Sequence, residues 1–219
     1  MVKQVSRSAP RRAGGANVRP RADGAAPNPS GAHVVRIVGG RWKRTRLPVL
    51  SRPGLRPTPD RVRETVFNWL GQDLGGWHCV DAFAGTGALG FEAASRGAAE
   101  VLLVEQDRAL VLQLAQVQQR LQADMVRIQR GDAVAMLRGL PPASVDAVFL
   151  DPPFDGADLF APALAAAAAA LRPDGVIYLE APVAWDDAMA GSCGLVVVRH
   201  LKAGMVHAHL MRLAGTRHA

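Results

Sequence analysis

Short apolar runs alternate with segments of helical periodicity along most of the chain, and this alternation predicts an α/β fold. The apolar runs predict seven strands: one begins at Cys79, and the others cover Val101–Val104, Met125–Gln129, Val145–Leu150, Gly175–Leu179, Leu195–His200 and Val206–Leu213. Helices are expected at Asp60–Leu70, Ala88–Arg96, Ala133–Arg138 and Asp158–Leu171. The tight Ala203-Gly204 turn makes the last two strands an antiparallel pair. We therefore expect a doubly wound, mostly parallel sheet with an antiparallel edge.

The N-terminal part of the chain has a different texture. Residues 1–32 are rich in Arg, Pro, Gly, Ser and Ala and lack apolar periodicity, so we expect a disordered basic tail. A hairpin is predicted next, with strands at Val34–Val38 and Arg41–Leu47 around the turn Gly39-Gly40. The chain is thus divided into the tail, a hairpin extension at 33–57 and an α/β domain at 58–219.

The helix at 60–70 has a clear start signal. Thr58 is expected to cap it, with Pro59 at its first position. Val62 and Val66 recur at helical spacing and are expected to pack in the core. Two cations lie off that apolar stripe and are expected to face a ligand or solvent: Arg61 and Arg63.

Charge is segregated along the chain. Residues 1–57 contain thirteen Lys or Arg and one acidic residue, whereas residues 58–219 contain thirteen Lys or Arg and eighteen acidic residues, for a net charge of +7. The excess of basic residues in 1–57 indicates a polyanionic partner. Nucleic acid is favoured over membrane because no amphipathic apolar face accompanies these residues. The expected hairpin combines cations for phosphate with a ring for stacking: Arg41, Trp42, Lys43, Arg44 and Arg46. The alternative is a basic hairpin that only keeps the protein in solution.

The tetrapeptide Asp151-Pro152-Pro153-Phe154 directly follows the strand predicted at Val145–Leu150, so it lies where open α/β sheets bind ligands. Ionised Asp151 and the carbonyl of Pro152 are both acceptors, and together they would orient an exocyclic amine of a nucleobase. Consecutive prolines remove competing backbone donors, and Phe154 offers a ring on which a base can stack. The motif indicates methylation of a nucleobase amine. An ordinary Pro-Pro turn that closes the strand is the alternative.

A glycine-rich turn follows the first strand. Gly85, Gly87 and Gly90 satisfy G-x-G-x-x-G, which serves nicotinamide enzymes and methyltransferases alike. Asp81 precedes the turn, where it would face the methionine ammonium of S-adenosylmethionine and repel a pyrophosphate. Glu105 ends the next strand, where a carboxylate grips ribose hydroxyls. The pattern favours S-adenosylmethionine, with a solvated Glu105 as the alternative reading.

The third strand is followed by Asp132-Ala133. A carboxylate at this strand end can accept a hydrogen bond from an adenine amino group. The same aspartate is also a good N-cap for the helix expected at Ala133–Arg138. The two roles are compatible, and both stay open.

The remaining chemistry-bearing residues suggest no further site. Cys79 and Cys193 show neither CxxC spacing nor a secreted framework, so a reduced cytoplasmic compartment is expected. His207 and His209 would share a strand face, but no metal site is expected from this pair. No signal peptide is recognised, and the most apolar run falls short of the roughly 20 residues that a bilayer requires. Because no exposed apolar stripe stands out, we expect a monomer.

At this point the chain resembles a known family of bacterial methyltransferases, the RsmD family. The resemblance covers roughly residues 34–213, and its most specific part is the segment Arg56–Leu70. It is carried by Arg36–Trp42, Leu55–Leu70, Asp81–Gly90, Glu105–Ala109 and Asp151–Phe154. The family implies a class I S-adenosylmethionine-dependent methyltransferase fold with a Rossmann-like sheet and a basic N-terminal hairpin and helix. It does not account for the tail.

The resemblance also implies an activity and its residues. The activity is methylation of a guanine N2 in 16S ribosomal RNA, of the guanine 966 type, with the RNA or the 30S subunit as partner. Catalytic positions fall on Asp151, Pro152, Pro153 and Phe154, and the hairpin contacts RNA. Cofactor positions fall on Asp81, Phe83, Gly85, Gly87, Glu105, Gln106, Asp132 and Ala133.

Three rival functions stay open. A DNA adenine-N6 or cytosine-N4 methyltransferase shares the proline motif, but it usually carries a target-recognition domain for which no segment here is long enough. A nicotinamide oxidoreductase is disfavoured by Asp81 and the proline motif. A non-catalytic ribosome-assembly protein is disfavoured by the intact Asp151, Gly85, Gly87 and Glu105.

Overall fold

A computed structural model describes residues 35–50, 58–153 and 156–215 of the chain. The tail at 1–32, Val34 and Phe154 lie outside the described residues, so the expectations for them stay predictions. Residues His33–Ala219 form one compact unit. The boundary expected between residues 57 and 58 is not marked by a separate body and remains a proposal.

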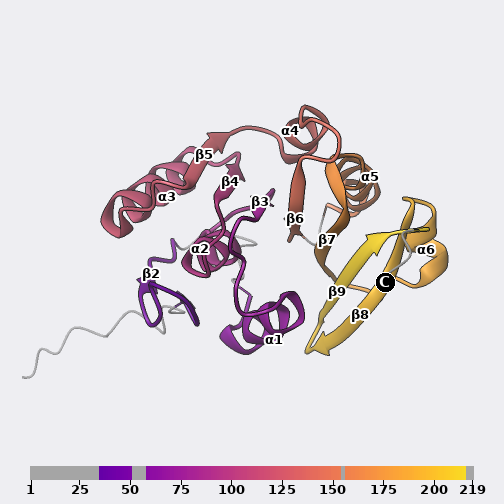
Figure 1. The fold of residues 1–219 in the computed structure, drawn as a ribbon, viewed down its shortest axis with the longest axis horizontal. Helices are drawn as coiled ribbons and strands as arrows, with labels where there is room; N and C mark the ends of the chain where they lie inside the picture. The colour runs from indigo at the N-terminus through magenta and orange to yellow at the C-terminus, as the bar shows by residue number, and fades with distance from the viewer. Residues whose placement is uncertain (1–34, 51–57, 154–155, 216–219) are drawn as a thin grey trace, which may run out of the picture. The chain divides into compact units, whose positions relative to one another are not determined.

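One seven-stranded sheet organises this unit, with the strand order β5-β4-β3-β6-β7-β9-β8 (Figure 1). Its strands are β3 (His78–Asp81), β4 (Glu100–Glu105), β5 (Val126–Arg130), β6 (Val145–Leu150), β7 (Leu171–Ala181), β8 (Leu195–Ala203) and β9 (Val206–Leu213). The first five in chain order are parallel to one another, and β9 pairs antiparallel with both β7 and β8. The predicted fold class is confirmed. The strand order reverses between β3 and β6, so the edge where these two end is the point at which such sheets bind ligands.

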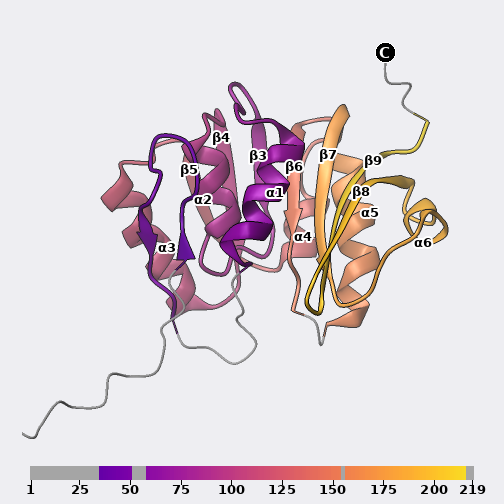
Figure 2. The same cartoon turned by 90° about the horizontal axis from the view of Figure 1, so that it is seen from below.

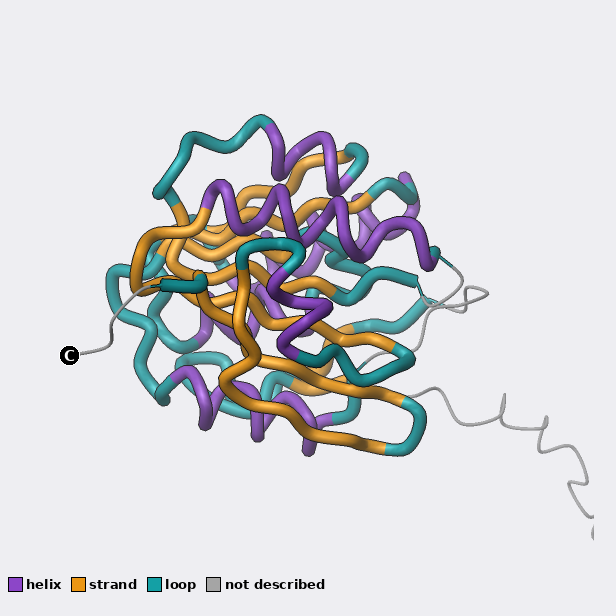
Figure 3. The backbone as a smooth tube through the Cα atoms, turned by 90° about the vertical axis from the view of Figure 1, so that its right-hand side faces the viewer, coloured by secondary structure: helices purple, strands orange, loops and turns teal. Residues whose placement is uncertain are grey.

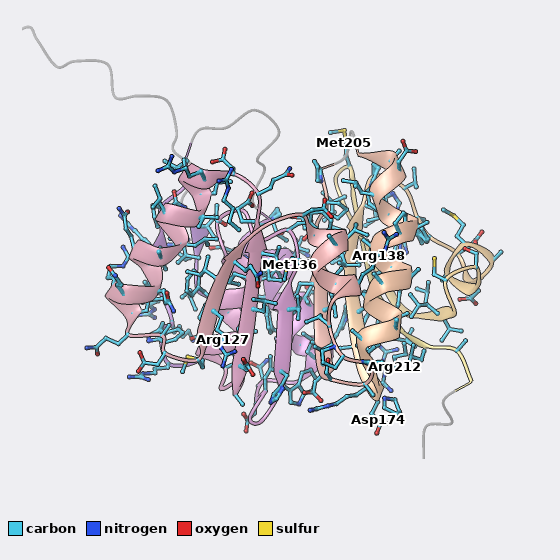
Figure 4. The ribbon with its side chains drawn as sticks, turned by 90° about the horizontal axis from the view of Figure 1, so that it is seen from above. Arg127, Met136, Arg138, Asp174, Met205 and Arg212 are labelled. Carbon is cyan, nitrogen blue, oxygen red and sulfur yellow. The ribbon has the colours of Figure 1, made fainter. Side chains whose placement is uncertain are left out.

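Helices cover both faces of the sheet, as the view onto the β8–β9 edge shows (Figure 3). Three lie on one face (Figure 2): α1 (Asp60–Leu70), α2 (Ala88–Ser95) and α3 (Arg108–Leu121). The other face (Figure 4) carries α4 (Ala133–Arg138) and α5 (Phe160–Ala170), which follows the 3-10 turn η1 (Ala157–Leu159), and the short α6 (Asp187–Gly191) packs on β8. Two apolar clusters result, one on each face of the sheet.

The predicted hairpin is present but much shorter than expected. Its strands are β1 (Val35–Arg36) and β2 (Arg46–Leu47), which pair antiparallel. Residues 41–44, expected in a returning strand, form a turn instead. Trp42 is 9% exposed and packs in the core, and the ring is therefore unavailable as the stacking surface proposed from the sequence. The indole is large and mostly apolar, and burying it gains more free energy than leaving it exposed beside its charged neighbours.

Helix α1 has the predicted bounds, but two expectations at its start are wrong. The Thr58 side chain makes no cap hydrogen bond, and its hydroxyl donates instead to Glu180 Oε1 at 2.6 Å. Arg63 is fully buried rather than facing ligand or solvent. Its guanidinium is held by Asp60 Oδ1 at 2.6 Å and Glu92 Oε2 at 3.5 Å, because a buried cation needs such partners.

Candidate active site

Acidic residues stand at the carboxyl ends of five adjacent parallel strands. Following the sheet from β5 to β7, these are Asp132, Glu105, Asp81, Asp151 and Glu180. The register places Asp81 opposite Phe149, two residues before Asp151, and Leu150 opposite Leu179, one residue before Glu180. Residues far apart in the chain are thereby brought to one edge of the sheet, and that edge is rich in negative charge.

The glycine turn between β3 and α2 has no room for larger residues at two of its glycines. Gly87 has φ +75°, and a Cβ there would approach Phe91 Cδ2 to 2.6 Å. A Cβ on Gly90 would approach Leu103 Cδ2 to 2.1 Å. Gly85 also has a positive φ, of 51°. The backbone therefore bends back closely over the strand ends and leaves the N-terminus of α2 facing the acidic edge.

Glu105 braces this turn. Its Oε2 accepts from the Gly85 amide at 2.9 Å, and its Oε1 accepts from the Asp107 amide at 2.8 Å. Gln106, between the two, uses its carbonyl to accept from Arg130 Nε at 3.2 Å. Glu105 is only partly exposed and bonds two backbone amides, so it is more than a solvated residue at the end of a strand. The carboxylate borders the glycine turn, where the sequence analysis placed a ribose.

Asp81 is buried at the end of β3, 2% exposed, and its Oδ2 accepts from the Gly90 amide at 2.9 Å. Burial raises the pKa of its carboxyl to about 7, with smaller contributions from the charges of Glu105 and Glu180, while the hydrogen bond from Gly90 acts in the opposite direction. A desolvated carboxylate of this kind is stabilised by a nearby cation.

Asp151 lies directly after β6, followed by the buried Pro152 and the exposed Pro153. Part of the residue surface of Asp151 is exposed, whereas its carboxyl group is surrounded by protein. Burial, then the charges of Glu180 and Asp81, raise the pKa of this carboxyl well above its usual range, and a hydrogen bond from Thr58 lowers it. Asp151 is thus a strong proton acceptor once ionised.

The sequence analysis did not identify two residues of this edge. Glu180 lies on β7 and is 2% exposed, and its Oε1 accepts from both Thr58 Oγ1 at 2.6 Å and Tyr178 Oη at 2.8 Å. The signal that could have found it is an acid directly after the apolar run 176–179, one strand over from the proline motif. Thr58 was read only as a helix cap, and nothing local indicates its partner 122 residues away.

Asp132 caps α4 as expected, since its Oδ1 accepts from the Ala135 amide at 2.8 Å. The residue is exposed and Ala133 behind it is buried. The N-cap role is confirmed. Contact of Asp132 and Ala133 with an adenine remains a prediction, as does any contact from Phe83, which is partly exposed and packs beside the cluster on the α4–α5 face.

The residues at this edge fit a cationic cofactor better than a pyrophosphate. Asp81 and Glu105 flank the glycine turn, and Asp151 stands on the adjacent strand. The two carboxyl groups that flank the turn would repel phosphates but attract an ammonium or sulfonium group. The donor set is therefore consistent with S-adenosylmethionine, and contact of Glu105 with ribose hydroxyls and of Asp81 with the cationic end stays a prediction.

A buried network joins the N-terminal segment to the α/β unit. Glu92 of α2 accepts from the amides of Val38 and Gly39, both at 2.7 Å, and pairs with Arg96 Nε at 2.8 Å. Arg63 Nη2 donates to the carbonyl of Arg36 at 2.6 Å. The β1–β2 hairpin is consequently fixed to α1 and α2 by charge-assisted hydrogen bonds rather than by a loose linker.

The structure separates the candidate RNA-contact residues into two places. The turn carrying Arg41, Lys43 and Arg44 sits at the C-terminal end of α2, because the Arg41 amide donates to the Ser95 carbonyl at 2.7 Å. Helix α2 starts at the glycine turn and has eight residues, so this turn is about 12 Å along the helix from the acidic edge. The expected hairpin cations are exposed but are not gathered at the site.

A second group of exposed cations lies nearer to the acidic edge. Arg36 is paired in register with Arg46, and its Nε contacts Asp60 Oδ2 at 3.4 Å in the first turn of α1. Arg61 is exposed in the same turn. Thr58 precedes this turn and bonds Glu180, so the start of α1 connects this group of arginines to the acidic edge. The sequence analysis named Arg46 as an RNA contact but not Arg36.

The described part of the chain contains neither a candidate metal cluster nor a candidate membrane span. Within residues 35–50, 58–153 and 156–215, no group of three or more His, Cys, Asp or Glu side chains could hold a metal ion. Among the described helices, none has the length and apolar composition to cross a membrane.

Comparison with known proteins agrees with this geometry. The family model described as Conserved hypothetical protein 95, that of the RsmD family, matches residues 35–212. The chain belongs to the RsmD family. The match includes the hairpin, α1, the glycine turn and the proline motif, which the sequence analysis used for its resemblance.

Named RsmD relatives share nearly half of the aligned positions. Ribosomal RNA small subunit methyltransferase D of Escherichia coli is 48% identical over 130 residues, which are 58% of this chain and 64% of the relative. The protein of the same name from Haemophilus influenzae is 44% identical over 133 residues, 58% of this chain and 67% of the relative. The alignment thus spans less than two thirds of the Escherichia coli relative.

Solved structures extend the likeness to the whole RsmD fold. An Escherichia coli structure described as a methyltransferase has a TM-score of 0.70 at 34% identity, over 82% of this chain and 98% of that one. A Haemophilus influenzae structure described as a methylase has a TM-score of 0.67 at 30% identity, with the same coverage. This member of the RsmD family has the class I methyltransferase fold.

Proposed function

We propose that this protein transfers a methyl group from S-adenosylmethionine to the exocyclic N2 of a guanine in small-subunit ribosomal RNA. The observation that carries the proposal is the placement of Asp151-Pro152-Pro153 after β6, on the strand adjacent to Asp81 and its glycine turn. A donor bound at the glycine turn and an amine bound at the proline motif would meet across that strand boundary. The names of the RsmD relatives support ribosomal RNA as the substrate.

The chain's own residues supply position and proton acceptance. Asp151 and the Pro152 carbonyl are the two acceptors for the amine, and two acceptors fix both the position of the nitrogen and the direction of its lone pair. When bound, S-adenosylmethionine supplies the electrophilic methyl group. Asp81 and Glu105 would hold its cationic end and its ribose hydroxyls. The ring of Phe154, the last residue of the motif, would stack on the target base.

We also propose a finer specificity for this activity. Guanine 966 is the position that the family resemblance suggests, with the naked RNA or the 30S subunit as substrate. A cytoplasmic location follows from that substrate. The exposed cations Arg36, Arg46 and Arg61, with the more distant turn at 41–44, are the proposed contacts to RNA phosphates.

Labelled methyl donor tests the proposal directly. The protein is incubated with it and with unmethylated small-subunit RNA, 30S particles or duplex DNA, and the labelled nucleoside is identified after digestion. We expect N2-methylguanosine from the ribosomal substrates and no label in DNA. Label in adenine N6 or cytosine N4 of DNA would identify the rival enzyme class instead.

A matched variant connects the activity to the site. Asp151→Asn keeps the size of the side chain but removes the carboxylate, so turnover should fall about 10²-fold or more while donor affinity stays nearly unchanged. Wild-type protein without activity on any ribosomal substrate, but with normal donor affinity, would favour the non-catalytic assembly role.

A further inference from the structure

Glu180 is a buried carboxyl group with no role in the function proposed above. It follows Leu179, whose register partner Leu150 precedes Asp151, so the two acids come next to each other on adjacent parallel strands. One oxygen of Glu180 accepts from two hydroxyls, those of Thr58 at 2.6 Å and Tyr178 at 2.8 Å. Hydrogen bonds to an ionised acceptor are strong, and two of them fix this carboxyl beside the catalytic motif.

Thr58 stands between the two carboxyl groups. Its hydroxyl donates to Glu180 and also acts as a hydrogen-bond donor toward Asp151, where it lowers the pKa of that acid. A hydroxyl has a single proton, so it donates to one carboxylate at a time and can accept from the other when that one is protonated. This arrangement of acceptor, hydroxyl and second acceptor is able to pass a proton.

We propose that Glu180 is the final proton acceptor of methyl transfer, reached from Asp151 through the hydroxyl of Thr58. The inference rests on the proposed function and assigns Thr58 and Glu180 to that same site as residues that act through Asp151.

The balance of the reaction requires such an acceptor. Transfer forms an N–C bond to the target nitrogen and breaks an S–C bond, whose electron pair stays on sulfur. The nitrogen then carries one proton too many, and Asp151 takes it. The pocket loses the positive charge of the sulfonium in the same step, so one carboxyl of a crowded acidic edge gains from becoming neutral. Passage through Thr58 to Glu180 frees Asp151 for the next amine.

The surroundings of Glu180 keep it available as an acceptor. Burial raises the pKa of Glu180, while the hydroxyls of Thr58 and Tyr178 and the charge of Arg63 lower it. Arg63 Nε also donates to the Thr58 carbonyl at 3.3 Å, which positions that residue. The groups that face Asp151 are Glu180, Asp81 and Thr58. Two carboxyls with raised pKa values thus lie on either side of one hydroxyl.

The test uses full-length protein with Thr58→Val, which removes the hydroxyl at constant shape, Thr58→Ser, which keeps it, and Glu180→Gln. Single-turnover methylation rates are measured against pH, together with donor affinity and thermal midpoint. Thr58→Val and Glu180→Gln should each slow the plateau rate roughly 10–10²-fold, as loss of a proton-transfer group does. Thr58→Ser should restore most of the rate, and donor affinity should stay within about twofold in all three.

The pH profiles separate a proton relay from a merely structural role. Asp151 works when ionised, so the rate rises with pH through its apparent pKa. Thr58→Val removes a donor that favours the ionised form, and the rising limb should move to higher pH. Glu180→Gln removes a neighbouring negative charge, and the limb should move to lower pH.

Three results would overturn the relay. One is a folded Thr58→Val protein with wild-type rate and profile. Another is slow Thr58→Val and Thr58→Ser proteins with a common loss of thermal midpoint and no shift of the limb. If Thr58→Val does not fold, a wild-type plateau in Glu180→Gln overturns it as well. Wild-type protein that never methylates RNA would instead remove the proposed function, and the relay with it.

Discussion

Glu92 offers the sharpest test of how the N-terminal segment is held. Its side chain is fully buried and serves four donors: the amides of Val38 and Gly39 at 2.7 Å each, Arg96 Nε at 2.8 Å and Arg63 Nη1 at 3.5 Å. Glu92→Gln keeps the volume but replaces the carboxylate with one acceptor and one donor group. Two buried guanidinium groups then lose the negative charge between them.

The cost can be estimated from what each partner retains. Breaking a buried ion pair usually costs about 3–5 kcal/mol, because an uncompensated charge stays desolvated. Arg63 still has Asp60 at 2.6 Å, and Arg96 still has the side-chain carbonyl of Gln72, so the lower end applies. We expect a loss of about 3 kcal/mol, a large part of the ~5–15 kcal/mol of a typical domain. For a unit of this size that is about 6–12 °C in Tm.

Urea unfolding followed by circular dichroism measures the loss, and hydrogen exchange at the Val38 and Gly39 amides reports where it occurs. Those two amides should exchange much faster in Glu92→Gln. Glu100→Gln is the control, because its pair with Arg127 is at the surface, with side chains 38% and 76% exposed. An exposed pair is worth less than about 1 kcal/mol. If Glu92→Gln costs no more than Glu100→Gln, the network does not anchor the hairpin.

Three other perturbations have defined outcomes. Glu105→Ala should weaken S-adenosylmethionine binding by about 1.5–3 kcal/mol, because ribose hydroxyls lose a charged acceptor; calorimetry with unaltered affinity would place Glu105 outside the site. Burial raises the pKa of Asp81 to about 7 from 3.8, so a cationic donor binds best to the ionised form, and affinity should rise about tenfold per pH unit up to about pH 7 and then level off. By the same linkage, the free protein should lose stability as pH rises from about 4 to 7, since the unfolded chain releases this proton first; Asp81→Asn should abolish the affinity trend and only weaken the stability trend, because the pKa values of Asp151 and Glu180 are raised as well. Replacing Arg36, Arg46 and Arg61 with Gln should weaken RNA binding, and the slope of log affinity against log salt concentration should decrease by up to ~0.7–0.9 per lost phosphate contact. The control is the same replacement of three cations that are exposed on other surfaces, Arg138, Arg199 and Lys202, and it should change RNA binding little. Equal effects of the two triples would make the attraction non-specific.

Local patterns in the sequence were enough for the elements of the sheet. Strands β6 and β9 and helices α1 and α4 have the bounds that were predicted, because each is an apolar or periodic run that ends within two residues of a Gly or an Asp. The positions of Asp81, Glu105 and Asp151 at strand ends followed from the same signals. Helix α3, Arg108–Leu121, was not predicted, although Asp107 is a regular N-cap whose Oδ1 accepts from the Ala109 amide at 2.6 Å.

Only the tertiary structure decided which side chains meet. Thr58 looked like a helix cap, yet its hydroxyl bonds Glu180, 122 residues away, because α1 and β7 come together on the folded sheet. Arg63 and Trp42 looked exposed, yet both are buried where the hairpin packs on α2. Periodicity reports which face a residue occupies on its own element, whereas its partners depend on which elements pack against that face. Asp81, Glu105, Asp132 and Asp151 at their strand ends were therefore readable from the sequence, but Glu180, the hydroxyls that bond it and the buried Arg63 were not.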